Sequence, residues 1–500
     1  MTEPRTFHNL IAGSWEEPRS GHYLENINPA NRDDTVGLFP ASGAEDVERA
    51  VDAALDAYAR WRLTPAPRRA EILFRAGQIL LERKADFARD MSREMGKTVI
   101  EAGGDVQEAI DMLFFMAGEG RRLYGQTTPS ELPDKLCMTL RVPIGVAGLI
   151  TPWNFPMAIP SWKTAPALIC GNTVVLKPAE DAPLSAVHWA QVLQEAGLPA
   201  GVFNLVMGEG EAAGAPLVRH RQTRIISFTG SSEVGREVGR EAAAQFKHCN
   251  LEMGGKNAIL ILDDAPLDLA LEGALWGAFG TSGQRCTAAS RLVVAKGIYR
   301  RFLDRFLEMA QALRIGNPLE AGTQIGPIIN AAQLERIEGY IQSGEAEGAK
   351  LRLGGRRCTQ GACAQGWFLE PTVFADVHAR MRIAQEEIFG PVVSVLPCEG
   401  LEDGLEIVNG SGYGLSAAVY TQNLATALRA QRDLEAGLVY LNAPTIGAEV
   451  HLPFGGIKQS GNGHRESGPA TLDVYSEWKT VYADFSGRLQ RAQLDTQSGS

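Results

Sequence analysis

The residue best suited to chemistry is Cys286, which lies in L-W-G-A-F-G-T-S-G-Q-R-C-T-A-A-S-R between Leu275 and Arg291. Cysteine reacts as the thiolate, and a neighbouring cation such as Arg285, together with backbone N–H groups at an incipient helix, would favour that ionised form. Cys286 is therefore a candidate nucleophile. On this stretch alone a second interpretation stands beside it, because most unpaired cysteines are small buried apolar residues.

A second candidate is the amide of Asn154 in P-W-N-F-P, from Pro152 to Pro156. Two prolines stiffen this loop, and a rigidly held amide can donate a hydrogen bond to a developing oxyanion without reorganisation. The same letters also fit a simpler role, in which Asn154 bonds within the turn and the aromatic side chains belong to the core.

Two glutamate motifs offer carboxylates. Glu252 lies among apolar and glycine residues in L-E-M-G-G-K-N, and burial raises a carboxyl pKa toward neutrality, where the group can act as a general base. Glu386 and Glu387 open E-E-I-F-G-P, a carboxylate pair before a G-P turn. Either motif could instead be a solvated charge at a helix end.

A phosphate-binding turn is expected in F-T-G-S-S-E-V-G, where a strand from Arg224 to Phe228 runs into Gly230 and Ser231. A helix that begins there offers free N–H groups to a pyrophosphate, although an ordinary serine-capped turn fits the spacing equally well. The motif is not a P-loop, because Arg236 stands where the lysine should be.

A ribose-binding group is expected after the strand from Thr173 to Leu176, at the end of a strand where ligands bind in open α/β sheets. Glu180 of K-P-A-E could accept a hydrogen bond from a ribose 2′-hydroxyl and would repel a 2′-phosphate. The alternative is that Lys177 and Glu180 form only an exposed loop. A cysteine, an amide, an isolated carboxylate and a phosphate-binding turn together fit oxidation through a thioester.

Composition sets the class of protein. With 500 residues, the chain exceeds what one hydrophobic core usually serves, so two large domains are expected. The net charge of -11 and the lack of a basic run argue against nucleic acid or an anionic membrane as partners. No signal peptide or membrane-length apolar run occurs, so we expect a cytoplasmic protein. Seven scattered cysteines are read as reduced thiols, and no His or Cys spacing predicts a metal site.

Apolar periodicity predicts the elements that must position these groups. Helical spacing predicts an amphipathic helix from Ala44 to Trp61 behind a capping box of Ser42 and Glu45, then helices over Arg68–Met95 and Asp105–Tyr124. From 144 onward short apolar runs alternate with helical patterns, in both halves of the chain. This order predicts an α/β fold with two mostly parallel sheets. Residues 127–141 read as an extended excursion, either a surface loop or an edge strand for a partner subunit, and 471–482 as strand-like.

The motifs P-W-N-F-P, K-P-A-E, F-T-G-S-S-E-V-G, L-E-M-G-G-K-N, G-Q-R-C-T and E-E-I-F-G-P-V, taken in order, resemble the aldehyde dehydrogenase superfamily, and the resemblance covers nearly the whole chain. It implies a Rossmann-like NAD-binding domain over 1–126 and 143–254, and a catalytic domain over 255–462. It also implies oligomerisation strands and a C-terminal tail over 127–142 and 470–500, which join subunits into a homodimer or homotetramer.

The resemblance also implies roles for individual residues. Cys286 matches the nucleophile, Glu252 the general base and Asn154 the oxyanion amide. The cofactor is expected to be NAD, with NADP as the alternative, and its site is made of Lys177, Glu180, Gly230, Ser231, Glu387, Phe389 and Trp153. The substrate pocket is assigned to Arg285, Phe155 and Phe454, with no metal.

The implied reaction oxidises an aldehyde to a carboxylic acid through a thiohemiacetal and a thioester that water hydrolyses. The substrate is expected to be a small aldehyde or a semialdehyde similar to 2,5-dioxopentanoate or aminoadipate semialdehyde. Arg285 could hold a substrate carboxylate, tune the thiolate or pair with a structural glutamate. Two alternatives remain: a semialdehyde dehydrogenase that transfers the acyl group to coenzyme A, and a non-catalytic binding protein of the same fold.

Overall fold

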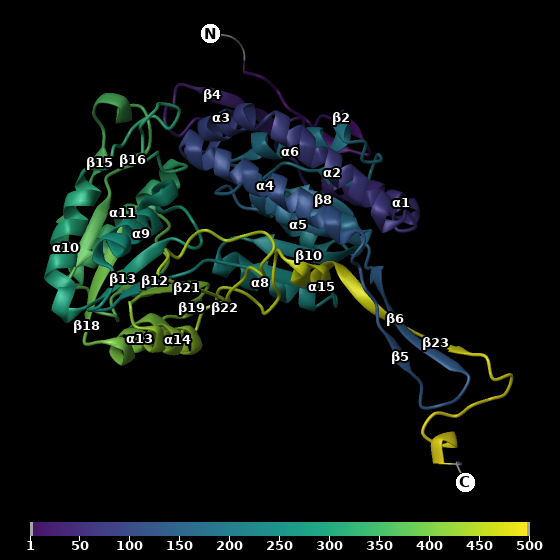
Figure 1. Cartoon of the computed structure of the whole chain (residues 1–500). Helices are drawn as coiled ribbons and strands as arrows, with labels where there is room; N and C mark the ends of the chain where they lie inside the picture. Colours follow the sequence, from purple (N-terminus) through teal and green to yellow (C-terminus); the bar gives the residue numbers. More distant parts are fainter. Residues whose placement is uncertain (1–3, 498–500) are drawn as a thin grey trace.

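Two seven-stranded sheets organise the chain in a computed structural model that describes residues 4–497 (Figure 1). The first sheet has the order β11 (His248–Glu252), β10 (Thr223–Thr229), β7 (Val146–Ile150), β8 (Thr173–Lys177), β9 (Phe203–Leu205), β1 (Asn9–Ile11), β2 (Ser14–Glu16). Its first five strands are parallel, and β1 and β2 add an antiparallel edge.

The second sheet has the order β14 (Lys350–Leu353), β17 (Thr372–Ala375), β18 (Val392–Cys398), β13 (Ala289–Ala295), β12 (Asn257–Ile261), β20 (Ser416–Tyr420), β21 (Leu438–Leu441). All of its pairs are parallel except β14 with β17. The predicted α/β class with two mostly parallel sheets is therefore confirmed.

Helices flank both sheets, as parallel strands buried on two faces require. With the first sheet go α1 (Ala44–Trp61), α2 (Ala66–Glu82), α3 (Lys84–Met95), α4 (Val99–Glu119), α5 (Ala158–Cys170), α6 (Pro183–Glu195), α7 (Ala215–Arg219), α8 (Ser232–Ala243) and, late in the chain, α15 (Leu472–Tyr475). With the second go α9 (Leu267–Phe279), α10 (Lys296–Gln311), α11 (Ala331–Ala346), α12 (Arg382–Gln385), α13 (Leu401–Asn409) and α14 (Leu424–Asp433).

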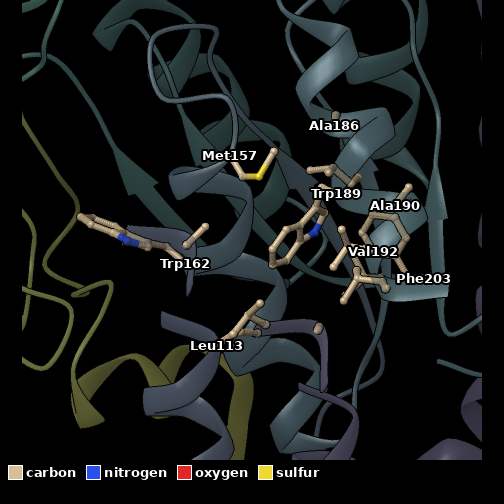
Figure 2. Packing of buried hydrophobic residues seen from close by; sticks show 14 of the residues in the cluster. Leu113, Met157, Trp162, Ala186, Trp189, Ala190, Val192 and Phe203 are labelled. Atoms are coloured by element: carbon tan, nitrogen blue, oxygen red, sulfur yellow. The ribbon is translucent and has the colours of Figure 1, made fainter. Parts of the chain in front are cut away.

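Buried apolar side chains form a hydrophobic core between the first sheet and its helices. Figure 2 shows Trp189 of α6 packed among Val192, Ala190 and Phe203, with Trp162 of α5 on the far side of the cluster. The Trp162 ring meets the ring of Phe454 edge-on, with centroids 4.9 Å apart. One side of α5 thus belongs to the core, and Trp162 reaches toward the segment around Phe454.

A three-stranded antiparallel sheet projects from the body of the molecule (Figure 1). It contains β5 (Thr127–Pro129), β6 (Lys135–Pro143) and β23 (Ser476–Asp484), and β6 pairs with β23 over its full length. The predicted excursion and the strand-like tail are therefore one unit, a pairing that neither segment indicates by itself.

Three local predictions are wrong. The helix expected over Arg68–Met95 is divided at Arg83, whose φ of −106° and ψ of 10° break the helical path. The helix expected over Asp105–Tyr124 begins six residues earlier, at Val99, and ends at Glu119. The Ser42–Glu45 capping box does not form, because Ser42 Oγ accepts a hydrogen bond from Asn9 instead and Gly43 caps α1.

Candidate active site

Every residue predicted for the site lies along one chain of three adjoining pockets. The inner pocket is lined by Phe155, Glu252, Arg285, Cys286 and Phe454. The middle pocket is lined by Trp153, Asn154, Gly230, Ser231, Cys286, Glu387 and Phe389, and the outer pocket by Trp153, Lys177, Glu180 and Gly230. Cys286 alone among the predicted residues faces both the inner and the middle pocket.

Cys286 follows α9 and a short turn, Gly280–Gly283, in which two consecutive residues, Thr281 and Ser282, have left-handed backbone angles (φ 54° and 55°). Its carbonyl oxygen accepts a hydrogen bond of 2.7 Å from Asn257 Nδ2. The loop that carries the sulfur is thus fixed on both sides.

The pKa of the Cys286 thiol is raised to about 12, first by burial and then by the nearby carboxyl groups of Glu387 and Glu252. Backbone N–H groups of Thr287 and of Cys286 itself act in the opposite direction, as expected. Arg285 is not among the largest contributions to this pKa. The thiol is therefore neutral at pH 7 in the chain alone.

Asn154 is buried, 2% exposed, and its Nδ2 donates a hydrogen bond of 3.1 Å to the carbonyl oxygen of Gln284. That places the amide beside the nucleophile segment, two residues from Cys286. The loop is held from behind by Asp105 of α4, whose carboxylate accepts from the Ala158 N–H at 2.7 Å, where α5 begins. The alternative of a bond within its own turn is not what the structure shows.

Glu252 ends β11, a strand that the sequence analysis missed, and is 2% exposed. Neither carboxyl oxygen has a hydrogen-bond partner in the described residues, 4–497. Burial, and then the neighbouring carboxyl group of Glu466, raise its pKa well above the ordinary value. Burial destabilises the charged form of such a carboxyl group, which raises its affinity for a proton and suits it to act as a general base.

Behind Glu252 lies a buried polar cluster that sequence reasoning did not find. Lys163 of α5 contacts the carboxylate of Glu466 and donates to Ser227 Oγ at 2.9 Å, while Asn250 Nδ2 donates to Glu466 Oε1 at 2.8 Å. These residues are up to 303 positions apart in the chain. No spacing could have indicated the cluster.

Glu387 and Phe389 form one wall of the middle pocket. The Gly255 N–H donates to Glu387 Oε1 at 3.0 Å, and burial raises the pKa of this carboxyl to about 7. A Cβ atom at Gly254 would lie 2.0 Å from Glu387 Oε2, so a larger residue there would displace this carboxyl group. The Phe389 ring meets the Trp153 ring edge-on, with centroids 5.4 Å apart.

The turn between β10 and α8 has the predicted form. Gly230 donates its N–H to the Glu252 carbonyl at 3.1 Å, and Ser231 Oγ caps α8 by accepting from the Val234 N–H at 3.3 Å. The serine cap and a ligand-binding role are compatible, because the first N–H groups of α8 still lack intrahelical partners.

In the outer pocket Lys177 Nζ donates to Glu180 Oε2 at 2.8 Å, and the lysine side chain is only 4% exposed. Lys177 is therefore buried, whereas the side chain of its partner Glu180 is 41% exposed. A buried lysine at the end of β8 holds the glutamate that follows it, and both side chains line the outer pocket.

Arg285 pairs with Glu101 of α4, with 3.3 Å between Arg285 Nη2 and Glu101 Oε1, and donates to Thr281 Oγ1 through Nε at 2.8 Å. Its guanidinium also lies over the rings of Phe155 and Trp276. Of the three roles considered, pairing with a structural glutamate is the one with direct contacts.

The inner pocket also has linings that the sequence analysis did not name: Glu108, Ala158, Ile159, Trp162, Thr229, Met253, Thr287, Gly447, Ala448 and Glu466. Most are apolar, so the pocket suits the carbon chain of a small molecule. Within residues 4–497 no group of three or more His, Cys, Asp or Glu side chains could hold a metal ion. No helix of that same range is long and apolar enough to cross a membrane.

Comparison with known proteins gives one answer throughout. A model of the aldehyde dehydrogenase family matches residues 15–481. An alpha-ketoglutaric semialdehyde dehydrogenase of Bacillus subtilis (strain 168) is 43% identical, over 96% of this chain and 99% of its own, and an alpha-ketoglutarate semialdehyde dehydrogenase of Haloferax volcanii is 42% identical, over 97% and 100%. The crystal structure of Staphylococcus aureus betaine aldehyde dehydrogenase in complex with NAD+ superposes with a TM-score of 0.94 at 33% identity, over 96% of each chain.

Proposed function

The chain belongs to the aldehyde dehydrogenase family, and from this premise we propose that it oxidises a semialdehyde to the carboxylic acid with Cys286 as nucleophile and NAD+ as hydride acceptor. The observation that carries the proposal is the place of Cys286 at the junction of two pockets. An apolar pocket on one side suits an aldehyde, and the longer path on the other side suits a dinucleotide.

The residues present fit a nicotinamide dinucleotide. The middle and outer pockets share Trp153 and Gly230 and so form one path from Cys286 to Glu180. Lys177 and Glu180 would hold the adenosine ribose, the turn at Gly230 and Ser231 the pyrophosphate, and Glu387, beside Phe389, the nicotinamide ribose. Glu180 would repel a 2′-phosphate, which favours NAD+ over NADP+. When bound, the cofactor supplies the hydride acceptor.

The chain's own groups account for the other steps. Glu252 accepts the proton of the Cys286 thiol, and the sulfur bonds to the aldehyde carbon to give a thiohemiacetal. Asn154 Nδ2 and the Cys286 N–H donate hydrogen bonds to the oxyanion. Loss of hydride from that carbon leaves a thioester. Glu252 releases its first proton to solvent before hydrolysis. Water then attacks the thioester carbonyl while its proton passes to Glu252, and cleavage of the C–S bond releases the acid and the thiolate.

The substrate proposal rests on the relatives and the pocket. Relatives of 38–43% identity are named for alpha-ketoglutarate semialdehyde or 2,5-dioxopentanoate. We therefore place 2,5-dioxopentanoate first and aminoadipate semialdehyde second. Transfer of the acyl group to coenzyme A is disfavoured because Glu252 is present to activate water, and a non-catalytic role is disfavoured because no catalytic side chain is lost.

We also propose a division of the chain into domains and an oligomerisation surface. The NAD-binding unit is assigned to 1–126 and 143–254, the catalytic unit to 255–462, and oligomerisation to the projecting sheet with 470–500. In favour of the last assignment, β23 pairs with β6 on one edge and with no strand of residues 4–497 on the other. A free strand edge can pair with a second copy. Residues 498–500 lie outside the described part of the chain.

The test is steady-state NADH formation from 2,5-dioxopentanoate and from butanal, with and without coenzyme A, for the wild type and for Cys286→Ser. We expect the wild type to form NADH without coenzyme A and the variant to lose at least ~10³-fold in kcat, since the serine hydroxyl is a far weaker nucleophile. Equal rates would refute the assignment of Cys286, and a strict need for coenzyme A would favour the acyl-transfer alternative.

A further inference from the structure

The turn before Cys286 is held in an unfavourable backbone conformation. Thr281 and Ser282 both have left-handed φ angles, which residues with a Cβ atom rarely adopt and almost never in succession. Such a turn persists only where surrounding contacts fix it. Ser282 is held from one side by its Oγ, which donates to the Gly326 carbonyl at 2.8 Å.

Thr281 is held by Glu101, the third residue of α4. Glu101 Oε1 accepts the Thr281 N–H at 2.6 Å, the Thr281 hydroxyl at 3.3 Å and Arg285 Nη2 at 3.3 Å. Arg285 closes the arrangement by donating to Thr281 Oγ1 at 2.8 Å. One carboxylate oxygen therefore binds both ends of the segment that leads into Cys286.

The other oxygen of Glu101 is fixed to its own helix. Oε2 accepts from the Thr98 N–H at 3.1 Å and from Thr98 Oγ1 at 2.9 Å, which completes the capping box of α4. The Glu101 side chain is only 5% exposed, so its carboxylate cannot exchange these partners for water. Glu101 therefore connects a rigid helix to a loop that lies 180 residues later in the chain.

We infer that Glu101 is a positioning residue for the nucleophile, and that Arg285 acts mainly as its partner in holding residues 281–285. This inference rests on the proposed role of Cys286. Glu101 lines none of the three pockets, so it does not contact a bound substrate. It acts on Cys286 only through the turn. Its effect is on where the sulfur and the Cys286 N–H point, relative to Asn154 and the aldehyde.

The experiment compares Glu101→Gln with Glu119→Gln. Glu119 is a matched control, because it lies at the other end of α4, is 4% exposed at its side chain and pairs with Arg122. In cofactor-free protein, the alkylation of Cys286 by iodoacetamide is followed against pH on the tryptic peptide 286–291, whose only cysteine is Cys286. Steady-state kcat and KM and thermal unfolding are measured in parallel.

We expect Glu101→Gln to lower kcat by about ten- to hundred-fold with little change in KM for NAD+, since a small displacement of a reacting group has a large effect on rate. The rate of Cys286 alkylation, or its midpoint in pH, should change as well. Glu119→Gln should match the wild type in both readouts, even if its Tm falls. Wild-type kcat and alkylation in Glu101→Gln, or equal losses in both variants, would overturn the inference.

Arg285→Met provides a second test that does not depend on the folding of Glu101→Gln. It removes both bonds of the guanidinium but leaves the Thr281 N–H bonded to Glu101. We expect equal losses of kcat/KM for anionic 2,5-dioxopentanoate and neutral butanal. A loss confined to the anionic aldehyde would show that Arg285 binds substrate and would refute its assigned role. Because alkylation needs no turnover, the Glu101 effect stays measurable even if the proposed oxidation is wrong.

Discussion

Replacing Glu252 by glutamine removes the base that both halves of the proposed reaction use. Neither carboxyl oxygen has a hydrogen-bond partner within residues 4–497, so an amide of the same shape breaks no side-chain hydrogen bond there when it takes their place. What the variant loses is the base. A positioned general base contributes about 10²–10⁴ in rate, or about 3–5 kcal/mol, and we expect steady-state NADH formation to fall by that amount.

The pH dependence gives a second reading of the same variant. Because the pKa of Glu252 is raised, the proton-accepting form grows as pH rises, and wild-type kcat should rise with it. The rise should be absent in Glu252→Gln. Ionisation of a buried carboxyl with a raised pKa opposes folding above its ordinary pKa, so glutamine removes that cost, and the variant's Tm at pH 8 should equal or exceed that of the wild type.

The assay is rapid mixing with NAD+ and 2,5-dioxopentanoate, followed at the absorbance of NADH. If hydrolysis of the thioester is the step that needs Glu252 most, a fast burst of NADH should precede the slow phase, with an amplitude near one per active site. An unchanged steady-state rate would refute the assignment of Glu252 as base. A lower Tm together with the lost rate would point to a structural defect instead.

Three further predictions concern the cofactor and two buried lysines. Glu180→Gln should raise kcat/KM for NADP+ relative to NAD+ by at least about tenfold, because a charge facing the 2′-phosphate is removed; an unchanged ratio would show that Glu180 does not face the ribose. Lys256 is fully buried, its Nζ has no partner within residues 4–497 and its pKa falls from 10.5 to about 7. Keeping it charged at pH 7 costs up to about 4 kcal/mol, so Lys256→Met should raise the free energy of unfolding in urea, with a gain that shrinks toward pH 10. Lys97→Met should do the opposite and cost about 3–5 kcal/mol, because Lys97 pairs with buried Asp105 and the carboxylate would lose its positive partner. The same sign for both lysines would contradict this reasoning.

Most helices and strands could be predicted, because the spacing of apolar residues within a short segment indicates whether that segment is a helix or a strand. Ala44–Trp61 was predicted to the residue, since its apolar positions repeat with helical period and Trp61 ends the run. The break at Arg83 could not be predicted, because the helical pattern continues through it with neither glycine nor proline. Strand β11 was missed because H-C-N-L-E alternates no better than a loop, and its burial comes from neighbouring strands.

The candidate site was predictable as a set of residue types, but not in its electrostatics. Motif order placed Cys286, Asn154 and Glu252, and the structure brings all three to the same pair of pockets. The direction of Arg285 depends on Glu101, 184 residues away, and the high pKa of the Cys286 thiol depends on burial. Neither can be read from neighbours in sequence, because both arise from tertiary packing.

The most direct test of the account is to identify the acylated residue. The Glu252→Gln variant is mixed with NAD+ and 2,5-dioxopentanoate and quenched in acid, and the masses of its tryptic peptides are measured by mass spectrometry. The account predicts that the peptide 286–291 gains the mass of the acyl group as one NADH forms per chain. NADH without any adduct on this peptide, or an adduct on another cysteine, would contradict the proposed role of Cys286.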